Sequence, residues 1–366
     1  MRVGIDATLA AQERIVGISR FVANLVDQLA AIAGPERYDL FYRPRARGGP
    51  RDLWHPPDRR FRARRLAFPL TLASFRGLDV YHSTYQWLPR YTGRAAVVGT
   101  LHDVVYSSRP DLGSKRTRER AQARYRDVAA RSRLIVTLSE YSKTEIVRSL
   151  GADPARIRVV PLAAEEAYAP RDEARITAAR RRWQITGPYI LFAGGFGRRK
   201  NATGALRAFA RALPELPGDV TLALSGTGGP LEREARQLVR ELGLETRVAL
   251  LGYVPDEEYP SLMSGCLVFF LPTLLEGFGL PALEAMACGA PVITSSTTSM
   301  PEVCADAALL ADPEDEAALA RALVSLCADG TARESLRRRG LERARHFDWR
   351  KVGEQMLAVY REAAAK

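Results

Sequence analysis

Two glutamates near the C-terminal end of the chain flank a short glycine-rich turn. The segment Glu276-Gly-Phe-Gly-Leu-Pro-Ala-Leu-Glu284 follows an apolar run that predicts a buried strand, and it leads into a short helix with Pro281 in its first turn. The N-terminus of a helix attracts an anion such as a phosphate, and ionised carboxylates accept hydrogen bonds from hydroxyl groups. A polyhydroxylated ligand with a phosphate between its two halves, such as a nucleotide sugar, fits this arrangement.

A basic glycine loop lies upstream of these glutamates. The strand-like run Tyr189–Ala193 is followed by Gly194-Gly-Phe-Gly-Arg-Arg-Lys-Asn201 and then by a predicted helix. Glycines allow the backbone to approach a ligand closely, and Arg199 and Lys200 supply the cations that a diphosphate needs. The loop is neither a GxGxxG fingerprint nor a Walker A motif, so the sequence supports neither a dinucleotide-dependent dehydrogenase nor a P-loop enzyme.

One histidine of the first half lies at the end of a predicted strand, in Thr100-Leu-His102-Asp103. Open α/β sheets bind their ligands outside the carboxyl ends of the strands. A single histidine at such a position is more often structural, so His102 becomes a candidate site residue only in the company of the other motifs.

Taken in this order, the motifs resemble glycosyltransferase family 4, whose members are retaining enzymes of the GT-B fold. The resemblance rests on Glu276-x7-Glu284 with its Gly-Phe-Gly insert, on the following Ala-Cys-Gly-Ala-Pro-Val run, on the basic glycine loop and on the His-Asp pair. It covers nearly the whole chain, with specific motifs mainly between Tyr189 and Val303. The pattern is most similar to bacterial mannosyl- or rhamnosyl-type transferases that build surface polysaccharides, which makes GDP-mannose the first expectation for the donor.

The resemblance implies a role for the two glutamates and for the histidine. Glu276 would accept hydrogen bonds from hydroxyls of the donor sugar, Glu284 from the ribose, and His102 would lie beside the reacting sugar. Further donor contacts, mostly from backbone groups, are expected at Gly17, Gly195, Tyr253, Val254, Phe278, Gly279 and Leu280.

The resemblance also implies that Lys200 and an arginine neutralise the departing diphosphate. Many family members place this arginine five residues before the lysine, where the chain has Gly195. Arg198 or Arg199 must then take the role, and the sequence leaves the choice open. Because no Asp-x-Asp triplet occurs, we expect neither a metal nor another cofactor, and the diphosphate charge would be neutralised by basic side chains and a helix N-terminus.

The alternation of strand-like and helical runs predicts an α/β protein with two parallel sheets. A chain of 366 residues exceeds one ordinary core. We expect an N-terminal acceptor-side Rossmann-like domain over residues 1–168, a linker over 169–187, a nucleotide-sugar-binding Rossmann-like domain over 188–347, and a C-terminal helix over 348–366 that crosses back to the first domain. In the GT-B fold that the resemblance implies, the two domains face each other across a cleft.

Predicted strands of the first half are Val3–Asp6, Asp39–Arg43, Asp79–His82, Ala96–Leu101, Leu134–Leu138 and Ile157–Val160. Those of the second half are Tyr189–Ala193, Val220–Ser225, Val248–Leu251, Cys266–Leu271 and Val292–Thr294. The Pro-, Gly- and Arg-rich stretch 44–65 predicts a mobile loop.

The positive charge is concentrated in the first half. Residues 1–170 hold 29 Lys and Arg against 17 Asp and Glu, which accounts for the entire net charge of +12. This excess is either a solvated basic face or a surface that attracts an anionic membrane or a diphosphate-linked lipid acceptor. No nucleic-acid-binding motif accompanies it, so we expect no nucleic-acid partner.

The remaining composition is that of a globular protein, with 46% hydrophobic and 26% charged residues. The first residues read as a buried strand, so we expect no signal peptide, and the four cysteines form no CxxC pair and read as reduced core residues. We therefore expect a cytoplasmic protein, at the inner face of the membrane if the basic half binds lipid.

Two other interpretations remain beside that of a retaining hexosyltransferase acting on a saccharide or lipid-linked saccharide. The first is a GT-B sugar-nucleotide epimerase or phosphorolytic relative, which would lack the Gly-Phe-Gly-bracketed glutamate pair in this form. The second is a polyanion- or membrane-binding scaffold, which has no use for the combination of His102, Arg199, Lys200, Glu276 and Glu284.

Overall fold

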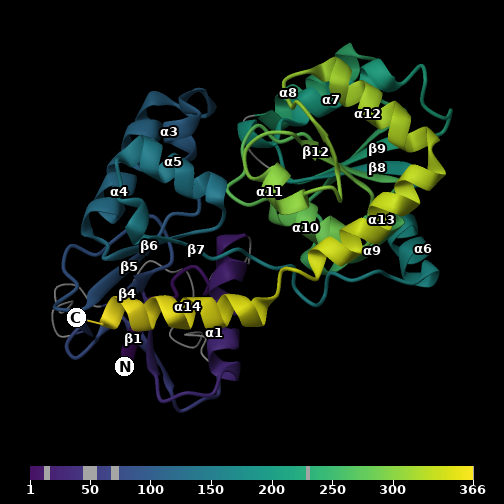
Figure 1. Ribbon diagram of the computed structural model, residues 1–366. Helices are drawn as coiled ribbons and strands as arrows, with labels where there is room; N and C mark the ends of the chain where they lie inside the picture. Colours follow the sequence, from purple (N-terminus) through teal and green to yellow (C-terminus); the bar gives the residue numbers. More distant parts are fainter. Residues whose placement is uncertain (12–16, 44–55, 67–73, 228–230, 366) are drawn as a thin grey trace. The chain divides into compact units, whose positions relative to one another are not determined.

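The computed structural model describes residues 1–11, 17–43, 56–66, 74–227 and 231–365. The chain divides into two compact units: Met1–Leu162 together with Asp348–Lys366, and Ala163–Phe347. Each unit is built on one parallel sheet with helices packed against it (Figure 1). None of the helices in the described part of the chain is both long and apolar enough to span a membrane.

The first unit contains a seven-stranded sheet in the order β3-β2-β1-β4-β5-β6-β7, parallel throughout. All six predicted strands of this half are present, each within two residues of its predicted ends. The strands are β1 (Arg2–Asp6), β2 (Arg37–Tyr42), β3 (Phe61–Arg65), β4 (Val80–Ser83), β5 (Ala96–Thr100), β6 (Leu134–Thr137) and β7 (Ile157–Val159).

The prediction of a loop over residues 44–65 is wrong for its last five residues, which form β3. Residues 44–55 lie outside the described part of the chain. Phe61 of β3 stacks on Tyr38 of β2, with ring centroids 4.6 Å apart, and Arg64 lies 3.1 Å from Asp39. The three arginines of β3 made this segment look like a loop. They suit an edge strand, where charged residues discourage pairing with another chain.

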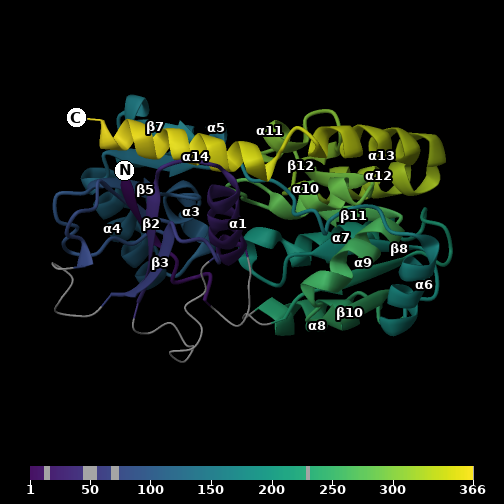
Figure 2. The same ribbon diagram turned by 90° about the horizontal axis from the view of Figure 1, so that it is seen from below.

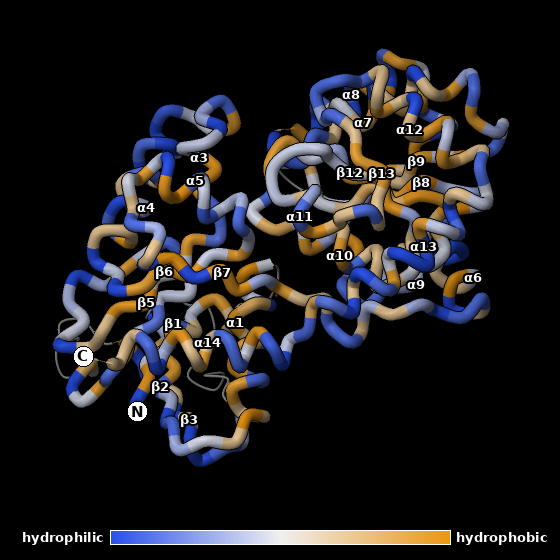
Figure 3. The backbone as a smooth tube through the Cα atoms, in the orientation of Figure 1, coloured by the Kyte–Doolittle hydropathy of each residue, from blue (hydrophilic) through white to orange (hydrophobic). Residues whose placement is uncertain are grey.

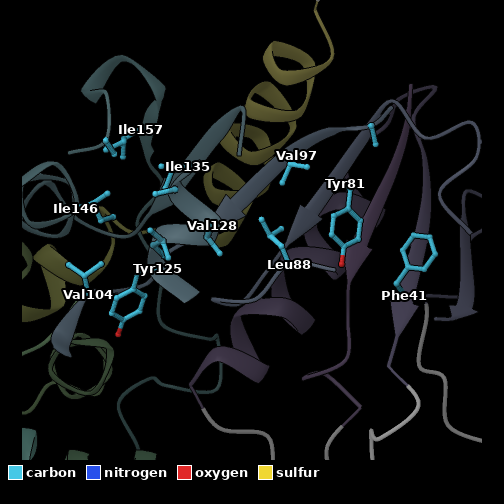
Figure 4. Close-up of a cluster of buried hydrophobic side chains, with 14 of the residues drawn as sticks. Phe41, Tyr81, Leu88, Val97, Val104, Tyr125, Val128, Ile135, Ile146 and Ile157 are labelled. Atoms are coloured by element: carbon cyan, nitrogen blue, oxygen red, sulfur yellow. The ribbon is translucent and has the colours of Figure 1, made fainter. Parts of the chain in front are cut away.

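Helices cover both faces of this sheet. One face carries α3 (Val105–Ser108), α4 (Lys115–Arg131) and α5 (Glu140–Leu150), and residues of α4 and α5 contribute to the apolar cluster of Figure 4. The ends of α5 were readable from the sequence, since the Ser139 hydroxyl caps its N-terminus and Gly151 ends it in the left-handed conformation. The other face carries α1 (Ile18–Ala31) and α14 (Trp349–Ala364).

The last helix, α14, packs against α1 and returns the end of the chain to the first unit, as the sequence predicted (Figure 2). A Cβ atom on Gly353 would lie 2.8 Å from Cβ of Gln28, so the two helices approach closely where a side chain is missing. Farther along α14, Arg361 pairs with Glu36 at 2.8 Å. Beneath α14, the buried His82 of β4 bonds through Nδ1 to the Tyr360 hydroxyl and through Nε2 to the Thr100 hydroxyl, each at 2.7 Å.

The second unit contains a six-stranded parallel sheet in the order β10-β9-β8-β11-β12-β13. Its strands are β8 (Tyr189–Ala193), β9 (Thr221–Ser225), β10 (Val248–Gly252), β11 (Val268–Leu271), β12 (Val292–Ser295) and β13 (Leu309–Ala311). Its helices are α6 (Glu173–Arg182), α7 (Ala202–Ala212), α8 (Leu231–Glu241), α9 (Tyr259–Gly265), α10 (Leu280–Ala287), α11 (Met300–Cys304), α12 (Glu316–Ala328) and α13 (Gly330–Ala344).

Apart from β3, the strands of both sheets are rich in apolar residues (Figure 3), because parallel strands are covered on both faces. This is why their sequences read as continuous apolar runs. The prediction missed β13, since a segment of three residues shows no periodicity.

The buried His82 makes the stability of the first unit sensitive to acid. Burial, with a contribution from His102, lowers the pKa of His82 from 6.5 to about 3. The unfolded chain therefore binds a proton at His82 that the folded chain excludes, and stability present above pH 6.5 is lost as the pH falls toward 3. The loss should be about 1.4 kcal/mol per pH unit in that window.

Thermal unfolding of the wild type and of His82→Gln, measured from neutral pH to about pH 5, checks this expectation. The substitution should lower the melting temperature at neutral pH, because it disturbs both hydrogen bonds, and should reduce the pH dependence. An identical pH dependence in the two proteins would show that His82 is not the group that must stay neutral.

Candidate functional site

A buried ion-pair cluster lies at the carboxyl edge of the second sheet. Lys200 Nζ lies 2.5 Å from Glu276 Oε1, and Arg199 Nη1 lies 2.9 Å from Glu276 Oε2. Only 7% of Lys200 and 5% of Glu276 is exposed. The cations predicted to bind a phosphate and the carboxylate predicted to bind a sugar therefore contact each other directly.

Three loops at the strand ends build this cluster. Lys200 ends a 3-10 turn (Arg198–Lys200) after β8, and Asn201 then caps α7 by accepting from the Gly204 amide at 3.2 Å. The Arg199 carbonyl accepts from the Thr273 hydroxyl at 2.8 Å, which ties the β8 loop to the loop after β11. The Ser299 hydroxyl, from the loop after β12, donates to the Glu276 carbonyl at 2.9 Å.

The electrostatics of the cluster favour an ionised carboxylate. Burial alone would raise the pKa of Glu276, but Arg199 and Lys200 outweigh it and lower that pKa to about 2. For Lys200, burial lowers the pKa, and the attraction of Glu276 opposes this shift without cancelling it. Because two cations share one carboxylate, Glu276 is held in its charged form.

The helix α10 begins directly beside this carboxylate. Gly279 precedes it with φ 99°, and a Cβ atom there would lie 2.5 Å from the sulfur of Met300, so glycine is required on both conformational and steric grounds. The first N–H groups of a helix have no partners within it, and Phe278 and Leu280 flank Gly279 at this end. Glu284, also buried, lies one turn into α10.

A second group of residues predicted to bind the nucleotide sugar lies in the loops after β8 and β10. Gly195 adopts φ 72°, and a Cβ atom on Gly226 would lie 2.3 Å from Cα of Gly195, so the loops after β8 and β9 touch through their backbones. The Gly226 amide donates to the Gly252 carbonyl at 2.7 Å. Tyr253 is 49% exposed and Val254 is buried.

Sequence reasoning overlooked part of this edge. Ser225 ends β9 and accepts a hydrogen bond from the Tyr259 hydroxyl at 3.1 Å, and Gly226 makes the close contact with Gly195. The signal was a Ser-Gly pair at a strand end, the same feature that marked the loop after β8.

Arg198 and Arg199, the two candidates for the diphosphate-binding arginine, differ in their surroundings. Arg199 reaches Glu276, whereas Arg198 is exposed. Arg199 is therefore the arginine of this loop that lies at the carboxylate.

In the first unit, His102 follows β5 and is 6% exposed. Its Nε2 lies 3.0 Å from the Thr84 carbonyl oxygen; since a carbonyl only accepts, Nε2 carries the proton and Nδ1 is the acceptor atom. Burial lowers the pKa of His102, and the hydrogen bond to Thr84 partly offsets this effect, which favours the neutral ring. Phe21 of α1 contacts the ring edge-on at 5.4 Å, four residues beyond Gly17 at the start of that helix.

The chain matches two family profiles along its length. Residues 15–166 match glycosyltransferase family 4, and residues 176–343 match glycosyl transferases group 1. The O-antigen chain mannosyltransferase B of Escherichia coli is 32% identical over 378 residues, which cover 98% of this chain and 99% of that protein. The chain belongs to glycosyltransferase family 4. It is thus a retaining hexosyltransferase that uses a nucleotide-sugar donor, and the family expected from its motifs is confirmed.

Solved structures agree on the fold of this glycosyltransferase. Sucrose-phosphate synthase from Thermosynechococcus elongatus matches with a TM-score of 0.80 at 24% identity, over 99% of this chain and 98% of that one. HepE of Anabaena, solved with UDP and glucose, matches with a TM-score of 0.76 at 17% identity, over 99% of each chain. The predicted GT-B fold, with its two Rossmann-like sheets and C-terminal helix packed on α1, is confirmed.

Replacement of Lys200 by Ala is expected to slow sugar transfer by this glycosyltransferase. If Lys200 stabilises the diphosphate as negative charge develops on it, its loss should cost about 2–4 kcal/mol of transition-state stabilisation. The measurement is kcat/KM for the donor, with the exposed neighbour substitution Arg198→Ala as the matched control, which should stay close to wild type. Wild-type turnover in Lys200→Ala would contradict the role given to this loop.

Proposed function

We propose that this protein transfers a mannose from GDP-mannose, with retention of configuration, to a saccharide or lipid-linked saccharide in the synthesis of a surface polysaccharide or glycoconjugate. The observation that carries the proposal is the buried cluster of Lys200, Arg199 and Glu276 beside the N-terminus of α10. The choice of mannose draws support from the full-length relative, which is named as a mannosyltransferase.

The ion-pair cluster gives donor binding a simple physical course. A diphosphate attracts Lys200 and Arg199 more strongly than one carboxylate does, because it carries more negative charge. As the cations turn to the diphosphate, Glu276 becomes able to accept hydrogen bonds from sugar hydroxyls. Glu284, one turn along α10, is the acceptor proposed for the ribose, and backbone groups at Gly195, Tyr253, Val254, Phe278, Gly279 and Leu280 complete the donor site.

In the transfer, the bond between the anomeric carbon and the diphosphate oxygen breaks and the acceptor hydroxyl loses its proton. The acceptor oxygen bonds to the anomeric carbon on the face from which the diphosphate departs, and the departing phosphate oxygen takes the acceptor proton. Lys200 and Arg199 stabilise the charge of the leaving diphosphate. His102, neutral and buried, is assigned to the side of the reacting sugar together with the backbone of Gly17.

A panel of nucleotide sugars tests the donor. Thermal unfolding is measured with UDP-, GDP-, ADP- and dTDP-linked sugars in EDTA, since a ligand that binds only the folded state raises the melting temperature by mass action. GDP-mannose is expected to give the largest shift, and Lys200→Ala should abolish it. A larger shift with another nucleotide sugar would replace GDP-mannose; a shift that needs Mg²⁺ or Mn²⁺ would overturn the metal-independent binding of the diphosphate.

We also propose that the basic first half holds the enzyme at an anionic membrane that carries the acceptor. On β3 and the turn before it, Arg60 is engaged by Asp58 and Arg64 by Asp39, whereas Arg59, Arg62 and Arg65 are exposed. The helix α4 exposes a further group of basic residues, Lys115, Arg116, Arg120, Arg124 and Arg126.

Reversal of the three exposed charges, in Arg59→Glu/Arg62→Glu/Arg65→Glu, is expected to weaken binding to anionic vesicles. Each basic residue near such a surface contributes about 1 kcal/mol, and the effect should fade as salt shortens the screening length. Co-sedimentation at two salt concentrations provides the measurement, and binding of the donor should be unchanged. Equal pelleting of variant and wild type, or none by either, would leave these arginines as a solvated surface.

A further inference from the structure

A fixed arginine lies at the carboxyl edge of the first sheet, outside the residues assigned so far. Arg43 directly follows β2, and its guanidinium carbon lies 4.7 Å from the centre of the Trp87 ring. Its Nε donates to the Thr8 hydroxyl at 3.2 Å, and the same hydroxyl accepts from the Arg43 amide at 3.1 Å. Stacking and hydrogen bonding thus hold the side chain from two directions.

The two terminal nitrogens of Arg43 make no hydrogen bond to another described residue. Within the described residues, no acceptor takes a hydrogen bond from Nη1 or Nη2, and 26% of the side chain is exposed. These two nitrogens form the planar fork that binds a carboxylate or a phosphate through two parallel hydrogen bonds. A guanidinium fixed before binding loses less conformational entropy when it meets such a group.

A buried carboxylate lies behind the arginine. Asp6, at the end of β1, is 2% exposed, and its Oδ1 accepts from the Thr8 amide at 3.0 Å. Its Oδ2 lies 3.6 Å from Arg43 Nε and accepts no hydrogen bond from the described part of the chain. Asp6 thus lies on the Nε side of Arg43, and the outer fork makes no ion pair with another described residue.

The loop that carries Trp87 is also fixed, and the network continues to His102. The Ser83 hydroxyl contacts the carbonyl oxygens of Tyr85 and Trp87. The Thr84 hydroxyl donates to the Asp6 carbonyl at 2.6 Å, and the Thr84 carbonyl accepts from His102. Arg43 and His102 therefore belong to one hydrogen-bonded edge.

The strand order sets the separation along this edge. In the sheet order β2-β1-β4-β5, three strand spacings separate the strand ends that carry Arg43 and His102. Three spacings correspond to roughly 14 Å. A group bound by Arg43 therefore lies well away from a hydroxyl that reacts beside His102. Binding energy from such a remote group can hold an acceptor in place for the reaction.

We propose that Arg43, stacked on Trp87 and fixed by Thr8, binds an oxyanion carried by the saccharide acceptor, at a subsite remote from the reacting hydroxyl. This inference rests on the proposed function, because it takes the acceptor to be a saccharide. The ligand class is a sugar that bears a phosphate or a carboxylate. A phosphate that links a saccharide to a lipid and a uronic acid within a saccharide share this chemistry.

The test measures binding of four probes by calorimetry: mannose 1-phosphate, glucuronic acid, methyl α-mannoside and inorganic phosphate. All proteins carry Lys200→Ala, so that the donor loop does not compete for the anions. We expect mannose 1-phosphate or glucuronic acid to bind about tenfold more tightly than the neutral glycoside. The tighter of the two identifies the source of the oxyanion. Equal binding of charged and neutral sugars, or of inorganic phosphate and its sugar ester, would overturn the proposal.

Substitutions at Arg43 locate the site. Arg43→Lys keeps a cation beside Asp6 but loses the fork, and Arg43→Met removes the charge; both should lower affinity for the charged sugar about tenfold. Arg37→Met, the same charge change at the exposed first residue of β2, should have no effect, which separates a specific contact from a general loss of charge. Circular dichroism checks that each variant is folded. If Arg43→Met does not fold, the result for Arg43→Lys alone tests the proposal. Unchanged affinity in Arg43→Lys would place the oxyanion elsewhere.

The nucleotide-sugar panel keeps the two proposals distinguishable. A failure of all donors to stabilise the wild type would contradict the proposed transfer, whereas oxyanion-sugar binding that depends on Arg43 would stand by itself. Donor stabilisation that is normal in Arg43→Lys, combined with no preference for charged sugars, would overturn only the subsite.

Discussion

A carboxylate kept charged inside the protein is the constraint on which the second unit depends. Glu276 is almost fully enclosed, and removal of an isolated ion from water is very unfavourable. Lys200 and Arg199 offset that penalty, and they do so only because the loops after β8 and β11 are fixed to each other. Hydrogen bonds from the Thr273 and Ser299 hydroxyl groups join the loops that carry the three charged side chains.

The contacts of Glu276 with Lys200 and Arg199 stabilise the edge of the second sheet on which they lie. When one member of a buried ion pair is removed, the folded protein loses several kcal/mol of stability, commonly about 3–5. A ligand that supplies a new anion to the cations and new donors to the carboxylate avoids this loss.

Much of the fold was readable from the sequence because the strands are buried on both faces and the helices carry clear caps. Apolar runs located eleven of the strands, and Ser139 with Gly151 marked both ends of α5. The edge strand β3 was missed because three of its five residues are arginines, of which Arg64 pairs with Asp39 of β2. At the site, residue types identified Lys200 and Glu276, but their direct contact spans 76 positions and follows only from the parallel order of β8 and β11. The contacts of Arg43 could not be predicted, since its partners Thr8 and Trp87 come from distant segments of the chain.

The return of α14 to the first sheet has a consequence for how the chain is made. The first unit combines Met1–Leu162 with the last residues of the chain, so the whole of the second unit is synthesised before the first is complete. Until Tyr360 leaves the ribosome, His82 lacks one of its two hydrogen-bond partners and α1 lacks the helix that packs on it. Domains generally fold as units during synthesis, the N-terminal one first; here the unit that begins first finishes last. An incomplete chain therefore exposes an apolar helix face, and premature termination anywhere before the last helix yields an unfinished first unit rather than a shorter enzyme.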